Sequence, residues 1–332
     1  MSRVGSPQAH GRTSPRLQCV WVAGATLMVG LMASCGGDAA VPAGSSTPPA
    51  AVTGTLSAAP GAVPSRDPVS SDAVRAARAV ESLLERHTAA WDTTKSADAV
   101  LALWAQDVRF TDLLAGWRDE PRATLEQMVR ESVGNPGLGS STHSYFVDTT
   151  GGVDSYDVWG LGDATQANPV HEVDVLETVD GLLTSMHTVY DVESLAHITG
   201  RPVADFAATQ ALIQGYADAW SSGEPSSVAE LYAEAASRTD ALWGESAEGR
   251  QVISDAAASS FGPHPSAAWQ VDIVFGDGPG EVMNGGVFTV RLGGPDACDL
   301  GAAVVLETNE AQKVVTERVY WELDSLIGCG LG

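Results

Sequence analysis

The spacing of apolar residues predicts a long helix that begins near residue 71. From there, apolar side chains and one histidine return every three or four positions, so they fall on one stripe of a helix. The stripe consists of Ala77, Val80, Leu84, His87 and Trp91. We therefore expect His87 to point into the apolar interior. A shorter helix is predicted from Asp98 to Ala105, and a third helix follows Asp119, which is placed to cap it.

The pattern then changes from helical spacing to strict alternation. In residues 108 to 112, apolar and polar side chains alternate, which predicts a strand with Val108, Phe110 and Asp112 on one face. Four more extended runs are predicted near residues 142–148, 153–161, 171–178 and 184–192. Asp180-Gly181 separates the last two runs and is typical of a hairpin turn.

This order of elements occurs twice in the sequence. Residues 108–122 and 236–250 match at an offset of 128, in the pairs Thr111/Thr239, Asp112/Asp240, Leu114/Leu242, Gly116/Gly244, Glu120/Glu248 and Arg122/Arg250. The sequence VLETVDG at 175–181 likewise returns as VLETNEA at 305–311. Each copy is long enough to bury its own core. We therefore expect two tandem domains, residues 71–199 and 203–327.

The first 70 residues have a different composition. Residues 1–16 hold three arginines and no acids, and residues 17–33 form an uncharged apolar run. That run ends in Leu31-Met32-Ala33-Ser34-Cys35, which resembles the lipobox of bacterial lipoproteins. We expect residues 1–34 to be a signal peptide and Cys35 to carry lipid, although an uncleaved anchor is the alternative. Residues 35–70 are rich in Pro, Gly, Ala and Ser and are expected to be a tether.

The charge balance limits the partners. Lys and Arg number 18 against 42 Asp and Glu, for a formal charge of −24. Such a surface repels nucleic acid, so we expect none to bind. We expect an exported, extracytoplasmic protein whose contact with the membrane is the N-terminal lipid. The sequence contains no phosphate-binding glycine loop and no paired Cys-x-x-Cys, and it predicts no cofactor and no metal.

Two cysteines remain after the predicted processing. Cys19 leaves with the signal peptide and Cys35 takes lipid, which leaves Cys298 and Cys329. Thiols that reach an oxidising compartment usually pair. Cys298 precedes a predicted strand at 302–308 and Cys329 follows one at 313–323, and antiparallel pairing of these strands brings the two cysteines together. We therefore predict a disulfide between them.

The order helix, helix, strand, helix and four-stranded sheet resembles the SnoaL-like and ketosteroid-isomerase-like group of the nuclear transport factor 2-like superfamily. The resemblance implies an α+β fold of two tandem cone-shaped domains, each with N-terminal helices packed in a curved antiparallel sheet around an apolar cavity. It also implies that the open sheet faces of the two copies pack together as an internal pseudo-dimer. The group contains enzymes and members that only bind, so the resemblance does not fix a reaction.

The same resemblance supplies candidate catalytic residues. In ketosteroid-isomerase-like enzymes a carboxylate at the end of the first strand is the general base, and Asp112 matches that position. The family's tyrosine on the first helix matches Tyr216 in the second copy but His87 in the first. A second acid would fall near Asp174. The full set resembles the dehydratase branch and consists of His87, Asp112, His143, His171 and Asp174.

Other readings stay open for these residues. Asp112 could cap a turn, and the histidines could equally be surface and core residues. Alternation places Glu172 and Asp174 on one face and His171 on the other, which argues against a metal site.

The candidate ligand-binding residues come from both copies. They are Trp91, Val108, Phe110, Tyr216 and Asp240. In the second copy Arg238 replaces Phe110, and an ion pair with Asp240 would partly fill that cavity. The leading hypothesis is therefore an envelope module that binds a small apolar ligand or a partner protein. The alternative is an acid/base enzyme, an isomerase or dehydratase, that uses Asp112 as its base. An enclosed pocket containing Asp112 and two histidines would favour the enzyme, and a filled cone would favour the binding module.

Overall fold

The computed structural model describes residues 68–92, 94–161, 164–261, 267–278, 282–293 and 297–332. The predicted signal peptide, the lipidated Cys35 and almost all of the predicted tether lie outside these residues. No helix among the described residues is long and apolar enough to cross a membrane.

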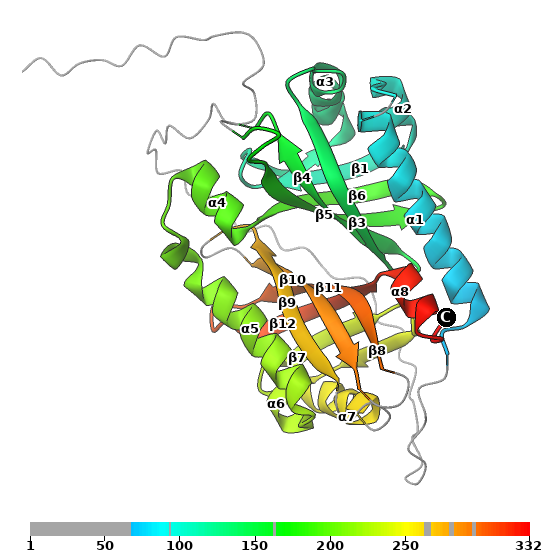
Figure 1. Cartoon of the computed structure of the whole chain (residues 1–332), viewed down its shortest axis with the longest axis vertical. Helices are drawn as coiled ribbons and strands as arrows, with labels where there is room; N and C mark the ends of the chain where they lie inside the picture. The colour runs from blue at the N-terminus through cyan, green and yellow to red at the C-terminus, as the bar shows by residue number, and fades with distance from the viewer. Residues whose placement is uncertain (1–67, 93, 162–163, 262–266, 279–281, 294–296) are drawn as a thin grey trace, which may run out of the picture.

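The same order of elements occurs in both halves of the described chain (Figure 1). The N-terminal half consists of α1 (Ser71–Asp92), α2 (Ala97–Ala102), β1 (Trp104–Asp112), β2 (Trp117–Pro121), α3 (Arg122–Ser132), β3 (Gly139–Val147), β4 (Gly151–Trp159), β5 (Val170–Val179), β6 (Leu182–Asp191) and α4 (Val192–Thr199). The C-terminal half consists of η1 (Val203–Phe206), α5 (Ala207–Ser222), α6 (Pro225–Ala229), β7 (Tyr232–Asp240), β8 (Glu245–Glu248), α7 (Arg250–Phe261), β9 (Ala268–Gly276), β10 (Met283–Leu292), β11 (Cys298–Thr308), β12 (Val314–Trp321) and α8 (Leu323–Gly328).

The sheets of the two halves have the same strand topology. In the N-terminal half β3, β4, β5 and β6 pair antiparallel in sequence, β1 joins β6 in parallel, and β2 pairs with β1. In the C-terminal half β9 to β12, β7 and β8 repeat these pairings. Short pairings of β6 with β9 and of β12 with β3 join the two into one mixed sheet. The predicted α+β class with curved sheets and N-terminal helices is therefore confirmed.

The two sheets pack against each other through a shared apolar layer. Its residues come from both halves and include Val153, Val173, Val189, Phe275, Val305 and Tyr320. Figure 1 shows α1 and α5 on opposite flanks of the molecule, with the sheets between them. Arg318 of β12 crosses the boundary and pairs with Asp148, with its Nε 3.0 Å from the carboxylate Oδ2. Helices therefore cover one face of each sheet, called here its inner face, and the opposite, outer faces of the two sheets pack against each other.

The local pattern explains α1 and β1. Four of the five residues of the predicted stripe of α1 are buried, His87 among them, and the fifth, Trp91, is half-buried. In β1 the residues Val108, Phe110 and Asp112 are all buried, as alternation predicts. The turn after β1 needs a positive φ at Gly116 (79°), which explains why glycine stands there.

Two local expectations were wrong, and two short strands were missed. The second helix ends at Ala102 rather than Ala105, because Trp104 already belongs to β1. Asp119 does not cap α3: it lies in β2, and the residue before the helix is Pro121, which makes no side-chain cap. The short strands β2 and β8 were not predicted, since each offers too few residues to show a period.

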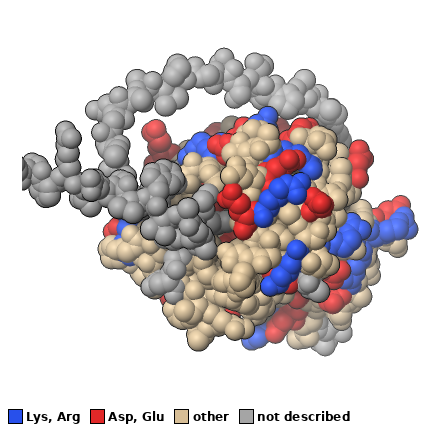
Figure 2. Space-filling model, turned by 90° about the horizontal axis from the view of Figure 1, so that it is seen from above, with Lys and Arg blue, Asp and Glu red and all other residues tan. Residues whose placement is uncertain are grey.

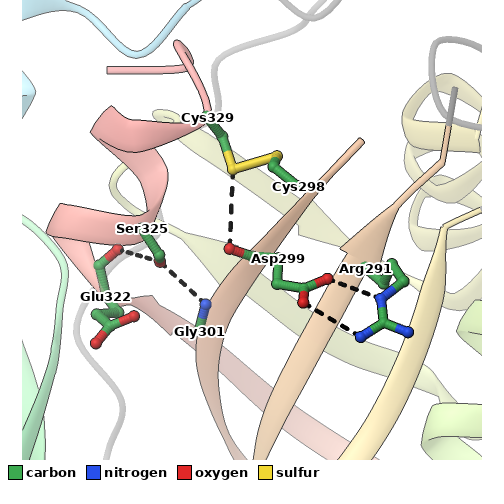
Figure 3. Close-up of a disulfide and its surroundings, with 7 residues drawn as sticks. All are labelled: Arg291, Cys298, Asp299, Gly301, Glu322, Ser325 and Cys329. Carbon is green, nitrogen blue, oxygen red and sulfur yellow. Dashed lines mark hydrogen bonds and ion pairs between the residues drawn. A yellow bond between two sulfur atoms is a disulfide. The ribbon is translucent and has the colours of Figure 1, made fainter. Parts of the chain in front are cut away.

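The predicted disulfide is present. Cys298 begins β11 and Cys329 follows α8, with their Cα atoms 5.9 Å apart and their sulfur atoms bonded (Figure 3). Ser325 of α8 accepts a hydrogen bond from the Gly301 N–H at 3.0 Å. The disulfide and this hydrogen bond together tie the last helix to the start of β11.

Charged side chains of both signs lie next to one another on the face seen from above (Figure 2). The part of that face that the structure describes carries no continuous basic patch.

Candidate functional site

The N-terminal half contains a cavity of about 870 Å³, its open mouth included. The helices α1 and α3 and the inner face of the sheet form its walls. Its polar lining includes His87, Asp92, Asp112, His143, Asp154, Tyr156, Glu172, Asp174, Thr188 and Tyr190, and its apolar lining includes Trp91, Phe110, Met128, Val158 and Met186. Val108, a predicted ligand-binding residue, is buried in the core and is not part of this lining.

Strand register places four polar side chains in one row across the sheet. Asp154 of β4 lies opposite Asp174 of β5, and Asp174 lies opposite Thr188 of β6. Thr188 in turn lies beside Asp112 at the end of β1. Directly opposite residues on neighbouring strands have side chains on the same face. The row therefore brings three carboxyl groups from distant parts of the sequence to the floor of one cavity.

Asp112 has two roles in this geometry. Its Oδ1 accepts the Ala115 N–H at 3.0 Å, so it caps the turn after β1. Its Oδ2 accepts the Tyr190 hydroxyl at 3.4 Å. Burial raises the pKa of Asp112 to about 6, although both hydrogen bonds favour the ionised form. The turn-capping role that the sequence left open for Asp112 is therefore present as well.

A second pair of carboxyl groups shares one tyrosine. Tyr156 Oη is hydrogen-bonded to Glu172 and lies 3.0 Å from Asp174 Oδ2. One hydroxyl has a single proton, so Tyr156 can donate to only one of them at a time. Burial raises the pKa of Asp174 to about 7, and burial and the charge of Asp174 raise the pKa of Glu172 well above its usual range. We infer that this pair retains a proton near neutral pH.

His143 is a fixed cation rather than a neutral acid or base. Its Nδ1 lies 3.0 Å from Asp154 Oδ1, and its Nε2 lies 3.0 Å from Ser140 Oγ and 3.4 Å from Asp92 Oδ2. Burial opposes its charge, but the hydrogen bonds and charges of Asp154 and Asp92 raise the pKa of His143 to about 9. The imidazolium also stacks on Tyr156, with ring centroids 4.8 Å apart.

His87 is neutral and held by two tryptophans. Its Nε2 accepts the indole N–H of Trp91 and that of Trp104, each at 3.1 Å. Burial, together with the charge of His143, lowers the pKa of His87 to about 4. The cavity therefore contains one charged and one uncharged histidine.

His171 does not join the site, contrary to the candidate set. Alternation along β5 turns it to the opposite face from Asp174, where its Nε2 lies 2.8 Å from Ser155 Oγ and its Nδ1 lies 2.9 Å from Asp157 Oδ1. This is the hydrogen-bond order of a Ser-His-Asp triad. Ser155 is only 2% exposed, however, and it lines neither of the two cavities described here. We assign the trio a structural role.

The equivalent space in the C-terminal half is filled by a buried ion network. Glu317 accepts the hydroxyl of Tyr216 at 2.7 Å and that of Tyr232, and Arg238 Nε lies 3.3 Å from its Oε1. Asp240 lies 4.0 Å from Arg238 Nη2 and accepts the Trp321 indole N–H at 3.2 Å. Alternation alone predicted the Arg238–Asp240 contact, but Glu317, the closer partner, was missed.

A second cavity of about 610 Å³, mouth included, lies beside this network. Four tryptophans line it together with Arg238, namely Trp220, Trp243, Trp269 and Trp321. Tyr216 and Asp240, predicted to bind ligand, do not line this cavity, because their polar groups are used inside the network.

Several cavity residues escaped the sequence analysis. They are Asp92, Asp154, Tyr156, Glu172 and Tyr190. Their signal was present in part, since Asp154 and Tyr156 alternate along one strand and Glu172 and Asp174 along the next. The hairpin at Asp180-Gly181 was predicted, but the pairing of β4 with β5 and its register could not be read from the sequence.

Comparisons with known proteins concern the fold. No family model matches the chain, and no curated protein is similar to it. One similar solved structure is a hypothetical protein with a ketosteroid-isomerase-like fold from Catenulispora acidiphila, in complex with trimethylamine (21% identity, 36% of this chain, 93% of that chain, TM-score 0.32). Another is a proposed SnoaL-like polyketide cyclase from Shewanella denitrificans (14% identity, 36% of this chain, 94% of that chain, TM-score 0.33). A third is a proposed SnoaL-like isomerase from Agrobacterium tumefaciens (19% identity, 35% of this chain, 97% of that chain, TM-score 0.30). About a third of the present chain thus spans nearly the whole of each neighbour.

Proposed function

We propose that the N-terminal half is an acid/base enzyme that moves a proton on a small, largely apolar molecule held in its cavity. The observation that carries the proposal is the presence of Asp112, buried and with a pKa near 6, in one cavity with His87 and His143. A carboxyl group with that pKa is mostly ionised at neutral pH and still accepts protons readily. The reaction class is isomerisation, with dehydration as the close relative.

The proposed step begins with removal of a proton from carbon. Asp112 takes a proton from a carbon next to a carbonyl group, the C–H bond breaks, and the electron pair moves onto the carbonyl oxygen. The substrate therefore carries a C=C bond next to the carbon that loses the proton. The carbonyl re-forms as Asp112-H returns the proton to the far carbon of that bond, so the C=C bond shifts, the carboxylate is regenerated, and atoms and charge balance. Phe110 and Trp91 form apolar walls that keep water from the carboxylate. The charge of His143 is neutralised by Asp154 and Asp92, so its role is to hold the cavity wall.

Ligand binding without chemistry is the second candidate. The observation that favours it is the hydrogen bond from the Ala115 N–H to Asp112, which gives this carboxylate a structural use in a turn. The two candidates differ in whether the ligand leaves the protein changed.

Proton exchange separates these candidates without knowledge of the natural substrate. The full chain is incubated in D2O with a panel of small cyclic ketones, and deuterium incorporation next to the carbonyl is followed by NMR. We expect exchange that rises with pH through about pH 6, and that falls by about 100-fold or more in Asp112→Asn. Asp240→Asn is the matched control and should exchange like the wild type. If the ketones bind, but deuterium incorporation is equally slow with the wild type and with Asp112→Asn, the function is ligand binding without chemistry.

We also propose that the protein is exported and anchored through lipid on Cys35. Support comes from the order of basic residues, apolar run and small residues before Cys35, and from the disulfide, which requires an oxidising compartment. Cys35→Ala should release the protein from membranes or block its processing. Firm membrane attachment with residues 1–34 retained would indicate an uncleaved anchor.

For the C-terminal half we propose a structural or interaction role as one side of an internal pseudo-dimer. Its filled interior and the apolar layer that it shares with the N-terminal sheet support this role.

A further inference from the structure

The second cavity brings four tryptophans from four parts of the C-terminal half to one place. Trp220 lies in α5, Trp243 follows β7, Trp269 lies in β9 and Trp321 ends β12. Trp220 and Trp321 are buried, whereas Trp243 and Trp269 are half-buried. Indole rings therefore line this cavity both in the interior and where the wall is partly exposed.

The indole rings are inclined to one another and do not stack face to face. Trp269 has its ring centroid 5.8 Å from that of Trp220 and 6.3 Å from that of Trp321, with interplanar angles of 39° and 61°. Aliphatic side chains of the sheet complete most of the remaining wall, namely Val290, Leu292 and Leu300. Indole faces and edges beside aliphatic groups are the surroundings that a flat aromatic ring prefers.

Arg238 is the charged residue in this lining, and it has more donors than the described residues use. Its guanidinium carries five N–H groups, and the residue is only 5% exposed. Among the described residues it makes one hydrogen bond, from Nη1 to Glu245 Oε2 at 3.4 Å, and its buried Nε makes none. Buried N–H groups normally meet an acceptor from the protein, from water or from a ligand. Arg238 is therefore a donor for an acceptor that enters the cavity.

The charges around Arg238 limit what that acceptor is. The one guanidinium faces three carboxyl groups: Glu317 lies 3.3 Å from its Nε, Asp240 lies 4.0 Å from its Nη2, and Glu245 is its hydrogen-bond partner. A carboxylate or phosphate ligand would add a further negative charge to this group and would be repelled. A cationic ligand would offer donors to a guanidinium that has only donors. An uncharged oxygen avoids both costs.

We propose that the cavity of the C-terminal half binds an uncharged aromatic molecule, with its ring among the four tryptophans and an uncharged oxygen accepting from Arg238. The guanidinium is already held in place, because it lies over the ring of Trp220 with its Cζ 5.1 Å from the ring centroid. The site adds a binding function to the half whose proposed role is packing. It does not depend on the enzyme proposed for the N-terminal half, so the absence of deuterium exchange there would leave it standing.

The ligand class is tested on the full chain with four molecules that share a phenyl ring and differ in its substituent. They are benzamide, benzoate, benzamidinium and isopropylbenzene. We expect benzamide to bind and to shift the indole N–H resonances of Trp220 and Trp321 in ¹⁵N NMR spectra. Each of the other three should bind at least about tenfold more weakly, because benzoate adds negative charge, benzamidinium lacks an acceptor and isopropylbenzene lacks the oxygen.

Filling the cavity tests where benzamide binds. Leu300→Trp places a large side chain in the cavity and leaves Arg238 unchanged, so benzamide binding should fall by at least about tenfold. Met186→Trp fills the N-terminal cavity instead and should bind benzamide like the wild type. Urea unfolding and the spread of the indole N–H resonances establish that each variant is folded. Val290→Phe fills the same cavity with a smaller group and serves as the second variant.

Arg238→Lys tests the role of the guanidinium. The lysine keeps a positive charge for Glu317 and loses the planar fork of donors. We expect benzamide binding to weaken by at least about fivefold while isopropylbenzene binding stays the same. General loss of structure would weaken both ligands alike, so the difference between them reports on recognition of the oxygen.

Several results would overturn the proposal. They are no binding of benzamide by the wild type, preference for benzoate or benzamidinium, undiminished benzamide binding by a folded cavity-filled variant, and equal losses for benzamide and isopropylbenzene in Arg238→Lys.

Discussion

The two halves share a repeated sequence motif but have different interiors. At the equivalent position of the first strand, the N-terminal half has Phe110 beside Met186, and the C-terminal half has Arg238 beside Glu317. The N-terminal half encloses a cavity that contains carboxyl groups. The C-terminal half fills the corresponding space with an ion pair and two tyrosine hydroxyls.

The residues that repeat most clearly maintain the backbone. Gly116 and Gly244 both adopt positive φ, 79° and 66°, in the turn after the first strand. Arg122 donates to the carbonyl of Trp104, and Arg250 donates at 3.0 Å to the carbonyl of Tyr232, the equivalent residue in the second copy. A repeated motif therefore identifies shared scaffold, and chemistry has to be sought where the copies differ.

The largest differences lie across the sheet floor. The strand positions that carry Asp174 and Thr188 in the N-terminal half carry Val304 and Val319 in the C-terminal half, where these two residues pair in the same way. The two halves thus handle buried acid differently. In the first half burial raises the pKa of Asp174 to about 7, and in the second half a single cation, Arg238, faces both Glu317 and Asp240.

The largest effect should come from removing that neutralising charge. Arg238→Met leaves Glu317 and Asp240 buried without a cation, so we expect the free energy of unfolding to fall by about 3–5 kcal/mol at pH 7 in urea titrations. Phe110→Met, the matched change in the other half, should cost less than about 1.5 kcal/mol. Equal losses for the two variants would show that the ion network is not what holds the C-terminal interior together.

Loss of the disulfide should have the next largest effect. Cys298→Ser/Cys329→Ser opens a loop with a sequence separation of 31, which predicts a loss of about 3–4 kcal/mol confined to the C-terminal half. Urea unfolding of the double variant and of the reduced wild type should agree. Ketone binding in the N-terminal cavity serves as the control and should persist, and its loss would mean that the halves do not keep separate interiors.

Replacing the two equivalent aspartates by asparagine should change the stability of the protein in opposite directions. Asp112 has a folded pKa of about 6 against an ordinary value of 3.8, so its stability contribution is lost as pH rises through 6. Asp112→Asn should therefore stabilise the protein by about 1–3 kcal/mol above pH 6 and lose this advantage below pH 3.8. Asp240→Asn should destabilise by about 1–3 kcal/mol at pH 7, because the carboxylate accepts from Trp321 and faces Arg238. Thermal melts at pH 4 and pH 8 would test both signs.

The sequence predicted those features of the fold that depend on the local spacing of apolar and polar residues. The buried stripe of α1, the inward face of β1 and the turn at Asp180-Gly181 follow from spacing, and the disulfide follows from the order of the C-terminal strands. The pairings of Tyr156 with Glu172 and of Arg238 with Glu317 were not predictable, because they depend on strand register. Register is set by long-range packing rather than by any short stretch of residues.

The smallest effect is expected at His171, which tests whether the chemistry belongs to one face of the N-terminal sheet. His171→Gln loses ring contacts with Ser155 and Asp157 on the outer face, and we expect a cost of about 1 kcal/mol. Because its side chain points away from the cavity, ketone binding and deuterium exchange should remain at wild-type levels. Asp174→Asn, on the inner face of the same strand, supplies the contrast and should change the pH profile of exchange. An exchange defect in His171→Gln that exceeds its loss of stability would place chemistry on both faces of the sheet and refute the one-sided site.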